Sequence, residues 1–292
     1  MNKTALSYTY YPGCSLHSTG VEYGLSTRAV FQRLGMELTE LPDWNCCGAS
    51  SAHALNHTLA LALPARNLAL AQEAGRDLVT PCAACFNRMK SADYAMRNDH
   101  AAREKLEDLL DFSYTGEVNV RPVMAVLFED FGTDKIAAQV KRPLKGLKVV
   151  PYYGCLLVRP PQVVQFDDPD NPQVMAKILR AAGAEVLDWS NATDCCGAGL
   201  SLSRSDVVQS LVGKLAERAR EAGADALVTG CPLCQVNLEM RQSGNGHTES
   251  SKMPAFFITE LVGLALGIPE AGKWWGKHLI DPRPVLRSVG LA

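Results

Sequence analysis

The stretch LVTPCAAC at residues 78–85 returns as LVTGCPLC at residues 227–234, which is 149 positions further along the chain. Each copy runs from a short apolar segment, typical of a buried strand, into a C-x-x-C pair that can open a helix. The same spacing of 149 separates Cys46-Cys47-Gly48 from Cys195-Cys196-Gly197. The chain therefore contains an internal duplication.

The duplication includes every cysteine of the chain. YYPGC ends at Cys14 and YYGC ends at Cys155, with a spacing of 141, and residues 129–132 (EDFG) resemble residues 260–263 (ELVG). We therefore predict two homologous domains, residues 1–143 and residues 144–292. The first cysteine set is Cys14, Cys46, Cys47, Cys82 and Cys85, and the second is Cys155, Cys195, Cys196, Cys231 and Cys234.

Length and composition fit a globular protein of two ordinary domains, with 292 residues of which 47% are hydrophobic and 21% are charged. A net charge of −2 gives no electrostatic attraction to nucleic acid or to an anionic membrane. The longest apolar run, residues 256–268, is too short to cross a bilayer. Residues 1–8 lack the apolar core of a signal peptide. We therefore expect a cytoplasmic protein with reduced thiols and no transmembrane segment.

Strand and helix patterns alternate within each half. We predict strands at residues 6–10, 36–41 and 77–80 in the first half and at residues 147–153, 184–189 and 226–229 in the second, with helices between them. This alternation predicts an α/β fold of two homologous domains, each a parallel sheet with flanking helices.

Two helix starts are predicted from prolines. Pro64 lies inside a helical pattern that ends before Gly75, so we expect the helix to start or kink there. In the second half, Asn171 is predicted as the cap of a helix with Pro172 at its first position.

The cysteines follow the predicted strands in the same order in both halves. Cys14 and Cys155 follow the first strand, the CCG pairs follow the second, and the C-x-x-C pairs follow the third. Because the carboxyl ends of parallel strands lie at one edge of a sheet, five thiols of each half are expected to converge there. The N–H groups of the helix after each C-x-x-C favour a bound thiolate or sulfide.

Four kinds of thiol site compete. Structural disulfides require an oxidising compartment, and a thioredoxin-like pair leaves three cysteines of each half unexplained. Structural zinc takes four thiolates, whereas each half offers five. An iron–sulfur cluster contains several irons, so that neighbouring cysteines can bind different ones. The pattern favours the cluster, with zinc, a redox pair and disulfides as alternatives.

The ten cysteines, together with YYGCLLVRP at residues 152–160 and CCGA at residues 195–198, resemble a known duplicated domain. It is the cysteine-rich CCG domain found in the B-type subunit of heterodisulfide reductase. The resemblance covers nearly the whole chain. It implies that each five-cysteine set ligates one noncubane [4Fe-4S] cluster, and that a disulfide is reduced between the two clusters.

The electron source is expected to lie in other subunits. The chain has no C-x-x-C-x-x-C-x-x-x-C-P run and no G-x-G-x-x-G fingerprint, so it lacks the motifs for a ferredoxin cluster or a dinucleotide. The resemblance implies two partners from a heterodisulfide reductase-like complex, a ferredoxin-like iron–sulfur subunit of the C type and a flavoprotein subunit of the A type.

Two polar residues beside the cysteines are weak candidates for catalysis. His17 could donate a proton to a leaving thiol, or could form a hydrogen bond within its loop. Arg159 could hold an anionic group of a substrate, or could form a salt bridge.

Four further features have a structural and a functional interpretation. Trp44 and Trp189 are expected to pack beside the CCG pairs, with substrate contact as the alternative. Residues 160–172 form either a connector or a substrate entrance, and residues 273–277 form either a surface arm or a docking site for a partner.

These observations predict a catalytic iron–sulfur subunit that reduces, or reversibly forms, a disulfide or a related thiol or persulfide. One alternative is a CCG electron-transfer subunit of a quinone-linked or hydroxyacid oxidoreductase. The other is a scaffold stabilised by zinc or by a cluster.

Overall fold

The computed structural model describes residues 6–49, 52–242 and 252–292. Residues 1–5, part of the stretch considered for a signal peptide, lie outside the described residues. None of the helices in the described ranges is both long and apolar enough to cross a membrane.

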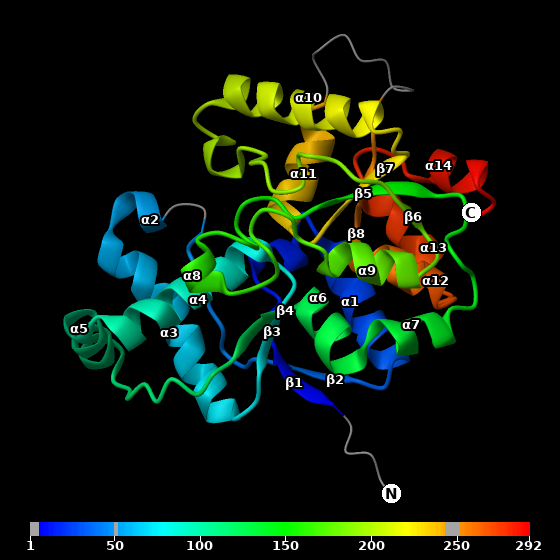
Figure 1. The fold of residues 1–292 in the computed structure, drawn as a ribbon. Helices are drawn as coiled ribbons and strands as arrows, with labels where there is room; N and C mark the ends of the chain where they lie inside the picture. The colour runs from blue at the N-terminus through cyan, green and yellow to red at the C-terminus, as the bar shows by residue number, and fades with distance from the viewer. Residues whose placement is uncertain (1–5, 50–51, 243–251) are drawn as a thin grey trace, which may run out of the picture.

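Two four-stranded sheets with only parallel strands form the centres of the two halves (Figure 1). The strand orders are β2-β1-β3-β4 and β6-β5-β7-β8, which become identical when each strand is replaced by its repeat. In both sheets the first strand pairs with the second and third, and the third with the fourth. The predicted α/β class with two parallel sheets is confirmed.

The first half contains four strands and the helices between them. These elements are β1 (Ser7–Tyr10), η1 (Cys14–His17), α1 (Val21–Arg33), β2 (Glu37–Glu40), α2 (Ala52–Leu55), α3 (His57–Ala74), β3 (Leu78–Thr80), α4 (Ala83–Asn98), α5 (His100–Leu110), β4 (Val120–Pro122), α6 (Val123–Ala125), the π-helix η2 (Val126–Phe131) and α7 (Thr133–Gln139).

The second half repeats the four strands with different helices. Its elements are β5 (Lys148–Tyr152), α8 (Pro161–Val164), α9 (Val174–Ala181), β6 (Glu185–Val186), η3 (Ala198–Leu200), α10 (Ser205–Glu221), β7 (Ala226–Thr229), α11 (Pro232–Met240), β8 (Ala255–Phe257), α12 (Ile258–Ala265), α13 (Ala271–Trp274), η5 (Trp275–Lys277) and α14 (Arg283–Ser288).

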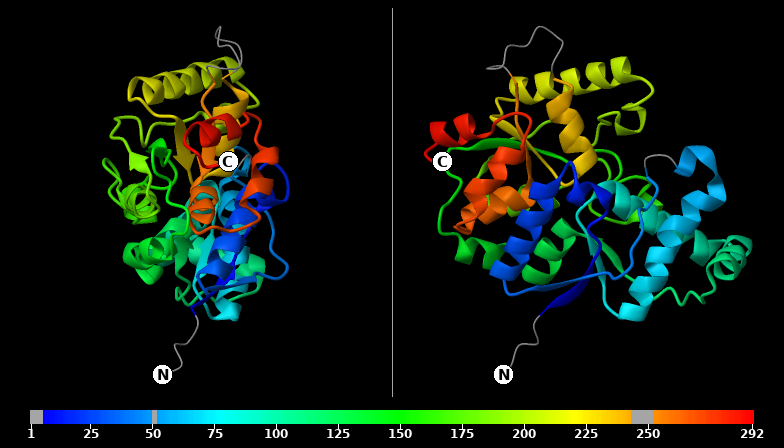
Figure 2. Two further views of the ribbon diagram at one scale, coloured as in Figure 1. Left: turned by 90° about the vertical axis from the view of Figure 1, so that its right-hand side faces the viewer. Right: turned by 180° about the vertical axis from the view of Figure 1, so that it is seen from behind.

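The halves pack against each other through helices (Figures 1 and 2). Helix α1 of the first half lies against α12 of the second, and α7 lies against α9. At the α1 contact the Ser26 and Thr259 hydroxyl oxygens are 2.6 Å apart, and the rings of Tyr23 and Phe257 stack with centroids 4.2 Å apart. The apolar core therefore continues from one half into the other. The domain boundary between residues 143 and 144 stays a prediction.

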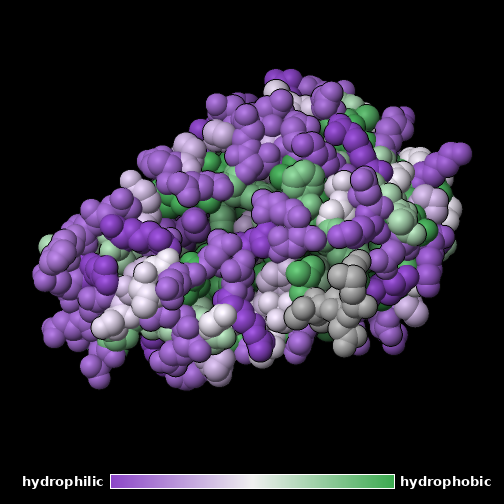
Figure 3. All heavy atoms as spheres, turned by 60° about the horizontal axis from the view of Figure 1, so that its bottom comes forward, coloured by the Kyte–Doolittle hydropathy of each residue, from purple (hydrophilic) through white to green (hydrophobic). Residues whose placement is uncertain are grey.

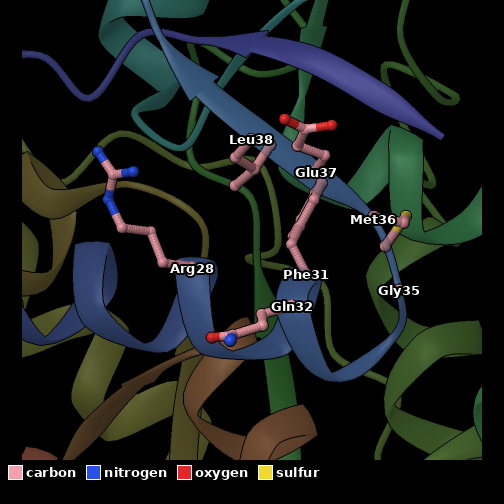
Figure 4. Close-up of a pocket in the computed structure, with 7 residues that line it drawn as sticks. All are labelled: Arg28, Phe31, Gln32, Gly35, Met36, Glu37 and Leu38. Carbon is pink, nitrogen blue, oxygen red and sulfur yellow. The ribbon is translucent and has the colours of Figure 1, made fainter. Parts of the chain in front are cut away.

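Polar side chains cover most of the face seen in Figure 3, and apolar atoms are visible there only in small areas between them. Figure 4 shows a groove between α1 and β2, lined by residues 28, 31, 32 and 35–38. It lies at the amino end of β2 and contains no cysteine, so it is not part of the candidate centre.

Each sheet has a fourth strand, β4 or β8, in addition to the three that the sequence pattern predicts. Neither helix starts at its predicted proline, and a kink at Pro64 stays a prediction. Helix α3 begins at His57, because the Asn56 side chain accepts the Leu59 N–H at 2.9 Å, and Pro64 lies within it. Helix α9 begins at Val174, where the Asp167 carboxylate accepts the backbone N–H at 2.7 Å.

Candidate metal centre

All ten cysteines lie at or just after the carboxyl ends of strands, as predicted. Cys14 opens η1 after β1, and Cys82 is the N-cap of α4 after β3. In the second half, Cys155 follows β5 and Cys231 is the N-cap of α11 after β7. The ten thiols therefore come from three strand-to-helix connections of each sheet, with Cys85 and Cys234 in the first turns of α4 and α11.

The cysteine sulfurs lie in four close pairs, two in each half. In the first half the Sγ atoms of Cys14 and Cys46 are 3.7 Å apart, and those of Cys47 and Cys85 are 3.3 Å apart. The second half repeats both: Cys155–Cys195 at 3.9 Å and Cys196–Cys234 at 3.5 Å. No disulfide joins any of them. Within the described residues, no three Cys, His, Asp or Glu side chains are placed to hold a single metal ion.

The two sets meet at one cysteine from each half. The thiol of Cys82 shares a hydrogen bond with Cys231, its own repeat. Both residues are buried, and each begins the helix that follows the third strand. The duplication thus places the two five-thiol sets side by side.

Glycines allow the loops to approach the sulfurs closely. Gly13 and Gly154 have φ of 72° and 62°, and a Cβ there would lie 3.0 Å from Cys85 Sγ and 3.2 Å from Cys234 Sγ. Any other residue at these positions would be strained and would press on a thiol.

The CCG glycine supplies a backbone donor in each half. The N–H of Gly48 lies 3.5 Å from Cys46 Sγ, and that of Gly197 lies 3.3 Å from Cys195 Sγ. A tyrosine fixes the residue that precedes the same cysteine: Tyr11 donates to the Asn45 carbonyl at 2.8 Å. In the second half, Tyr152 donates to the Asp194 carbonyl at 2.7 Å. The pattern predicted neither tyrosine role, although YY precedes both cysteines.

Three of these sulfurs are stabilised as thiolates. Hydrogen bonds from the Cys14 and Cys47 thiols lower the pKa of Cys46, and a hydrogen bond from Cys155 lowers the pKa of Cys195 to about 6. The pKa of Cys231 is well below its usual value because the thiol of Cys234, the thiol of Cys82 and backbone N–H groups of α11 all donate to it. Thiolates are the form of cysteine that binds metals.

The donor set fits iron–sulfur ligation. Such clusters are held by cysteine thiolates, and each half supplies five cysteines from three loops. In addition, the hydroxyls of Thr80 and Thr229, two residues before Cys82 and Cys231, are buried without a hydrogen-bond partner. Such groups are rarely left unpaired, so this interior offers polar contacts to a bound group.

The weaker candidates lie at the solvent side of the centre. His17 is exposed, and its ring stacks on Trp44 with centroids 5.6 Å apart. Arg159 pairs with Asp170 at 2.9 Å, which is the salt bridge considered above. Trp189 donates to the Pro151 carbonyl at 2.8 Å, so its indole packs as part of the loop.

The sequence pattern gave no indication of the role of Asn87. It follows Cys85 by two positions in α4, and its amide donates to the carbonyls of Leu156 and Arg159 at 3.1 and 2.8 Å. The loop that carries Cys155 is thereby tied to the first half. Residues 273–277 are partly core, because Trp274 and Trp275 are buried.

The family model described as "Cysteine-rich domain" (CCG) matches this chain twice, at residues 8–90 and 149–239. The 8-methylmenaquinol:fumarate reductase membrane anchor subunit of Wolinella succinogenes is 31% identical over 94% of this chain and 97% of its own length. The B-type subunit of the ferredoxin/F420H2-dependent CoB-CoM heterodisulfide reductase of Methanosarcina acetivorans is 28% identical over 88% of each chain. The resemblance to the B-type subunit of heterodisulfide reductase is confirmed.

A solved structure shares the fold. A hypothetical protein from Helicobacter pylori matches with a TM-score of 0.73 and 12% identity over 94% of this chain. The present chain spans about half of its length, 52%.

Proposed function

This chain belongs to the family of cysteine-rich CCG domain proteins, and from that premise we propose that it is the iron–sulfur subunit of a heterodisulfide reductase-like complex. Its task is to reduce, or reversibly form, a disulfide or a related thiol or persulfide with electrons from partner subunits. One observation carries the proposal: two equivalent five-thiol sets adjoin at Cys82 and Cys231.

We propose that each set holds one [4Fe-4S] cluster of the noncubane type. The residues that would hold it are those of the two sets defined above. When bound, such groups supply single electrons, and a pair of them matches a disulfide, which takes two.

The cysteines divide the centre into a side that is exposed to solvent and a side that is buried. Cys14, Cys46 and Cys195 are exposed, whereas the two C-x-x-C pairs are buried. A substrate would therefore approach the exposed cysteines, while the buried ones keep water from the contact between the halves. At the exposed side, His17 and Arg159 are the groups best placed to meet a substrate, as proton donor and as anion contact respectively.

Partners and location follow from the same premise. The chain lacks a dinucleotide fingerprint, so we propose that other proteins of the complex deliver its electrons. These are a flavoprotein subunit of the A type and a ferredoxin-like iron–sulfur subunit of the C type. We place the complex in the cytoplasm, where the ten thiols stay reduced.

A second function has an observation in its favour. The relative from Wolinella succinogenes, which is 31% identical to this chain, is named as part of a menaquinol:fumarate reductase. The same fold could therefore serve as an electron-transfer subunit of a quinone-linked or hydroxyacid oxidoreductase, in which no disulfide reacts. A scaffold held by zinc is the alternative from another class.

Metal and sulfide analysis separates the scaffold from the redox functions. Anaerobically purified protein should contain about eight irons and equivalent acid-labile sulfide, with little zinc. Stoichiometric zinc without sulfide would overturn the proposal.

Spectroscopy separates the two redox functions. A substrate thiol added to oxidised protein should change the magnetic spectrum of the centre if sulfur chemistry takes place there. If the spectrum stayed unchanged while the protein turned over with a quinol, and if it did not turn over with a disulfide, the electron-transfer function would be assigned instead.

A further inference from the structure

Four ionisable side chains that are not cysteines are buried together at the contact between the halves. Glu22 comes from α1 of the first half, Glu239 from α11, and Glu260 from α12. His278 follows η5 near the end of the chain. A buried charge is costly in free energy unless it is paired and hydrogen-bonded, so the partners of each of these side chains decide its charge.

His278 lies between two carboxylates. Its Nδ1 is 2.8 Å from Glu239 Oε1 and its Nε2 is 3.0 Å from Glu260 Oε1, and all three side chains are fully enclosed. Burial by itself lowers the pKa of His278, but the carboxylates of Glu260 and Glu239 outweigh this and raise it to about 11. The imidazole is therefore a cation that donates from both nitrogens at neutral pH.

The two carboxylates also have their other oxygens satisfied. Glu239 Oε2 accepts the N–H of Leu279 at 2.7 Å, and Glu260 Oε2 accepts the N–H of Phe257 at 2.8 Å. Both acids thus receive the donors that stabilise their ionised form. The trio of His278, Glu239 and Glu260 has a net charge of −1 and connects the chain end to α11 and α12.

Glu22 differs from the trio because one of its carboxyl oxygens lacks a partner. Its side chain is 1% exposed, and Oε1 has no hydrogen-bond partner. Burial, together with the nearby carboxylates of Glu260 and Glu239, raises the pKa of Glu22, while its own backbone N–H and His278 oppose the shift, and the resulting pKa is about 7. Ionisation of Glu22 would bring the buried group from −1 to −2, so this carboxyl is the member that exchanges a proton near neutral pH.

The candidate centre is close to this group along two helices. Glu239 follows Cys234 by five residues in α11, which is roughly 7.5 Å along the helix axis. At the start of α1, a Cβ on Gly20 would lie 3.0 Å from the Cβ of Pro232, the residue after Cys231. Charges in the interior interact strongly because water does not screen them.

We propose that Glu22 is a proton-binding site whose occupancy is coupled to the number of electrons held by the cysteine-rich centre. One electron passes from a reduced partner, or from dithionite, to the centre, and one proton passes from solvent to the Glu22 carboxylate. No net charge is then added to the buried contact. When the electron leaves for the acceptor, the proton leaves Glu22. The proposal rests on the proposed iron–sulfur function.

Among the described residues, the other ionisable groups around Glu22 are hydrogen-bonded or exposed to solvent. Glu239 and Glu260 each share a hydrogen bond with His278 and accept one from a backbone N–H. On the other elements packed against α1, the ionisable groups are exposed to solvent: Lys273 of α13, Lys277 of η5, His17 of η1, and Glu37 and Glu40 of β2.

A purely structural role explains the trio but not Glu22. The trio of His278, Glu239 and Glu260 hydrogen-bonds the backbone near the chain end at Leu279 and needs no fourth carboxyl. An unpartnered buried carboxyl oxygen, in contrast, destabilises the fold. The structural role and the proton-binding role differ in the redox behaviour of a Glu22 variant.

The test is a redox titration of anaerobically purified holoprotein from about pH 5 to about pH 9, for wild type and Glu22→Gln. Wild type should bind its electron up to tenfold less tightly per pH unit within part of this range, a slope of up to 59 mV for a one-electron couple. In Glu22→Gln this slope should disappear. The variant should match wild type at acid pH and have the higher potential at alkaline pH, where wild-type Glu22 is charged.

The matched control is Glu73→Gln, which neutralises an exposed carboxylate of the first half. It should retain the wild-type slope. Equal slopes in wild type and Glu22→Gln would overturn the proposal. Because iron content is measured in the same samples, loss of the proposed function, seen as no iron in wild type, is distinguished from failure of this inference alone.

A second measurement needs no variant. The reduced-minus-oxidised infrared spectrum of wild type near neutral pH should show a carboxylic acid C=O band appearing on reduction, and ¹³C-labelled glutamate should shift it. Absence of a glutamate band would overturn the proposal even if Glu22→Gln failed to fold.

Discussion

The two halves hold their cysteine sets with the same backbone and different neighbours. Sulfur pairs, the positive-φ glycines and the tyrosine hydrogen bonds before each CCG repeat in both halves. The contacts behind the CCG loops do not. In the first half the Asn67 side chain in α3 forms two hydrogen bonds with the backbone of Asn45. It accepts a hydrogen bond from the Asn45 N–H at 3.0 Å and donates one to the Asn45 carbonyl at 2.9 Å.

The second half supports the equivalent loop from other elements. Asn191 donates to the Asp194 carboxylate at 2.7 Å within the loop, and Asn237 of α11 donates to the Cys196 carbonyl at 3.4 Å. The two halves thus support equivalent CCG cysteines through different side-chain contacts.

The solvent sides of the two sets also differ. The first has the stacked His17 and Trp44, and the second has the loop in which Arg159 pairs with Asp170. An asymmetric substrate, such as a disulfide of two different thiols, would meet an aromatic surface on one side and a charged loop on the other.

Loss of one ligand gives the sharpest test of the equivalence. Cys47→Ser and Cys196→Ser should each reduce the iron content from about eight to about four per chain, because each half supplies its own thiols. Disulfide turnover should fall almost to zero in both, since one centre cannot supply two electrons together. Loss of all iron in a folded single variant would contradict the two-centre arrangement.

The glycines before the first cysteines should be the next most sensitive positions. Gly13→Ala and Gly154→Ala each combine a positive φ with contact to a sulfur, and should destabilise by about 1–3 kcal/mol and reduce iron content. Gly35→Ala is the control, because Gly35 also has a φ of 74° but has open space at the Cβ position. It should lose roughly 1 kcal/mol by chemical denaturation and keep its iron. Equal iron loss in all three variants would rule out the sulfur contact as the cause.

The tyrosines should have smaller and matching effects. Tyr11→Phe and Tyr152→Phe each remove one hydrogen bond to a backbone carbonyl, which should lower the free energy of unfolding by about 0.5–1.5 kcal/mol; the Asn45 carbonyl keeps its bond from Asn67. Urea titrations of both variants measure this. A large difference between them would show that the two CCG loops are not held equivalently.

The smallest effect is expected at the asymmetric solvent side. Arg159→Ala removes an ion pair whose side chains are 47% and 82% exposed, so stability should change by less than about 0.5 kcal/mol. The proposed anion contact predicts a raised KM with unchanged iron content. An unchanged KM would show that Arg159 serves the ion pair with Asp170 alone.

Local predictions failed where short segments depend on tertiary contacts. Strands β4 and β8 have only three residues each and run directly into helices, so their pattern is weak, although EDFG and ELVG repeat just beyond them. The start of α9 depends on Asp167, which lies in the inserted loop and has a φ of 55°. Asn171 has the right residue type for a cap but lies outside the helix that forms.

The sequence by itself determined the duplication, the parallel α/β halves and the convergence of five thiols at each sheet edge. These follow from local periodicity and from the rule that the loops after parallel strands share one edge. Only the tertiary structure decided that the two sets meet at Cys82 and Cys231, and that Glu22 joins Glu239, Glu260 and His278. The second depends on the packing of α1 against α12. That contact joins residues more than 200 positions apart through apolar burial, which constrains hydrophobicity but not the choice of partner, so no spacing in the chain encodes it.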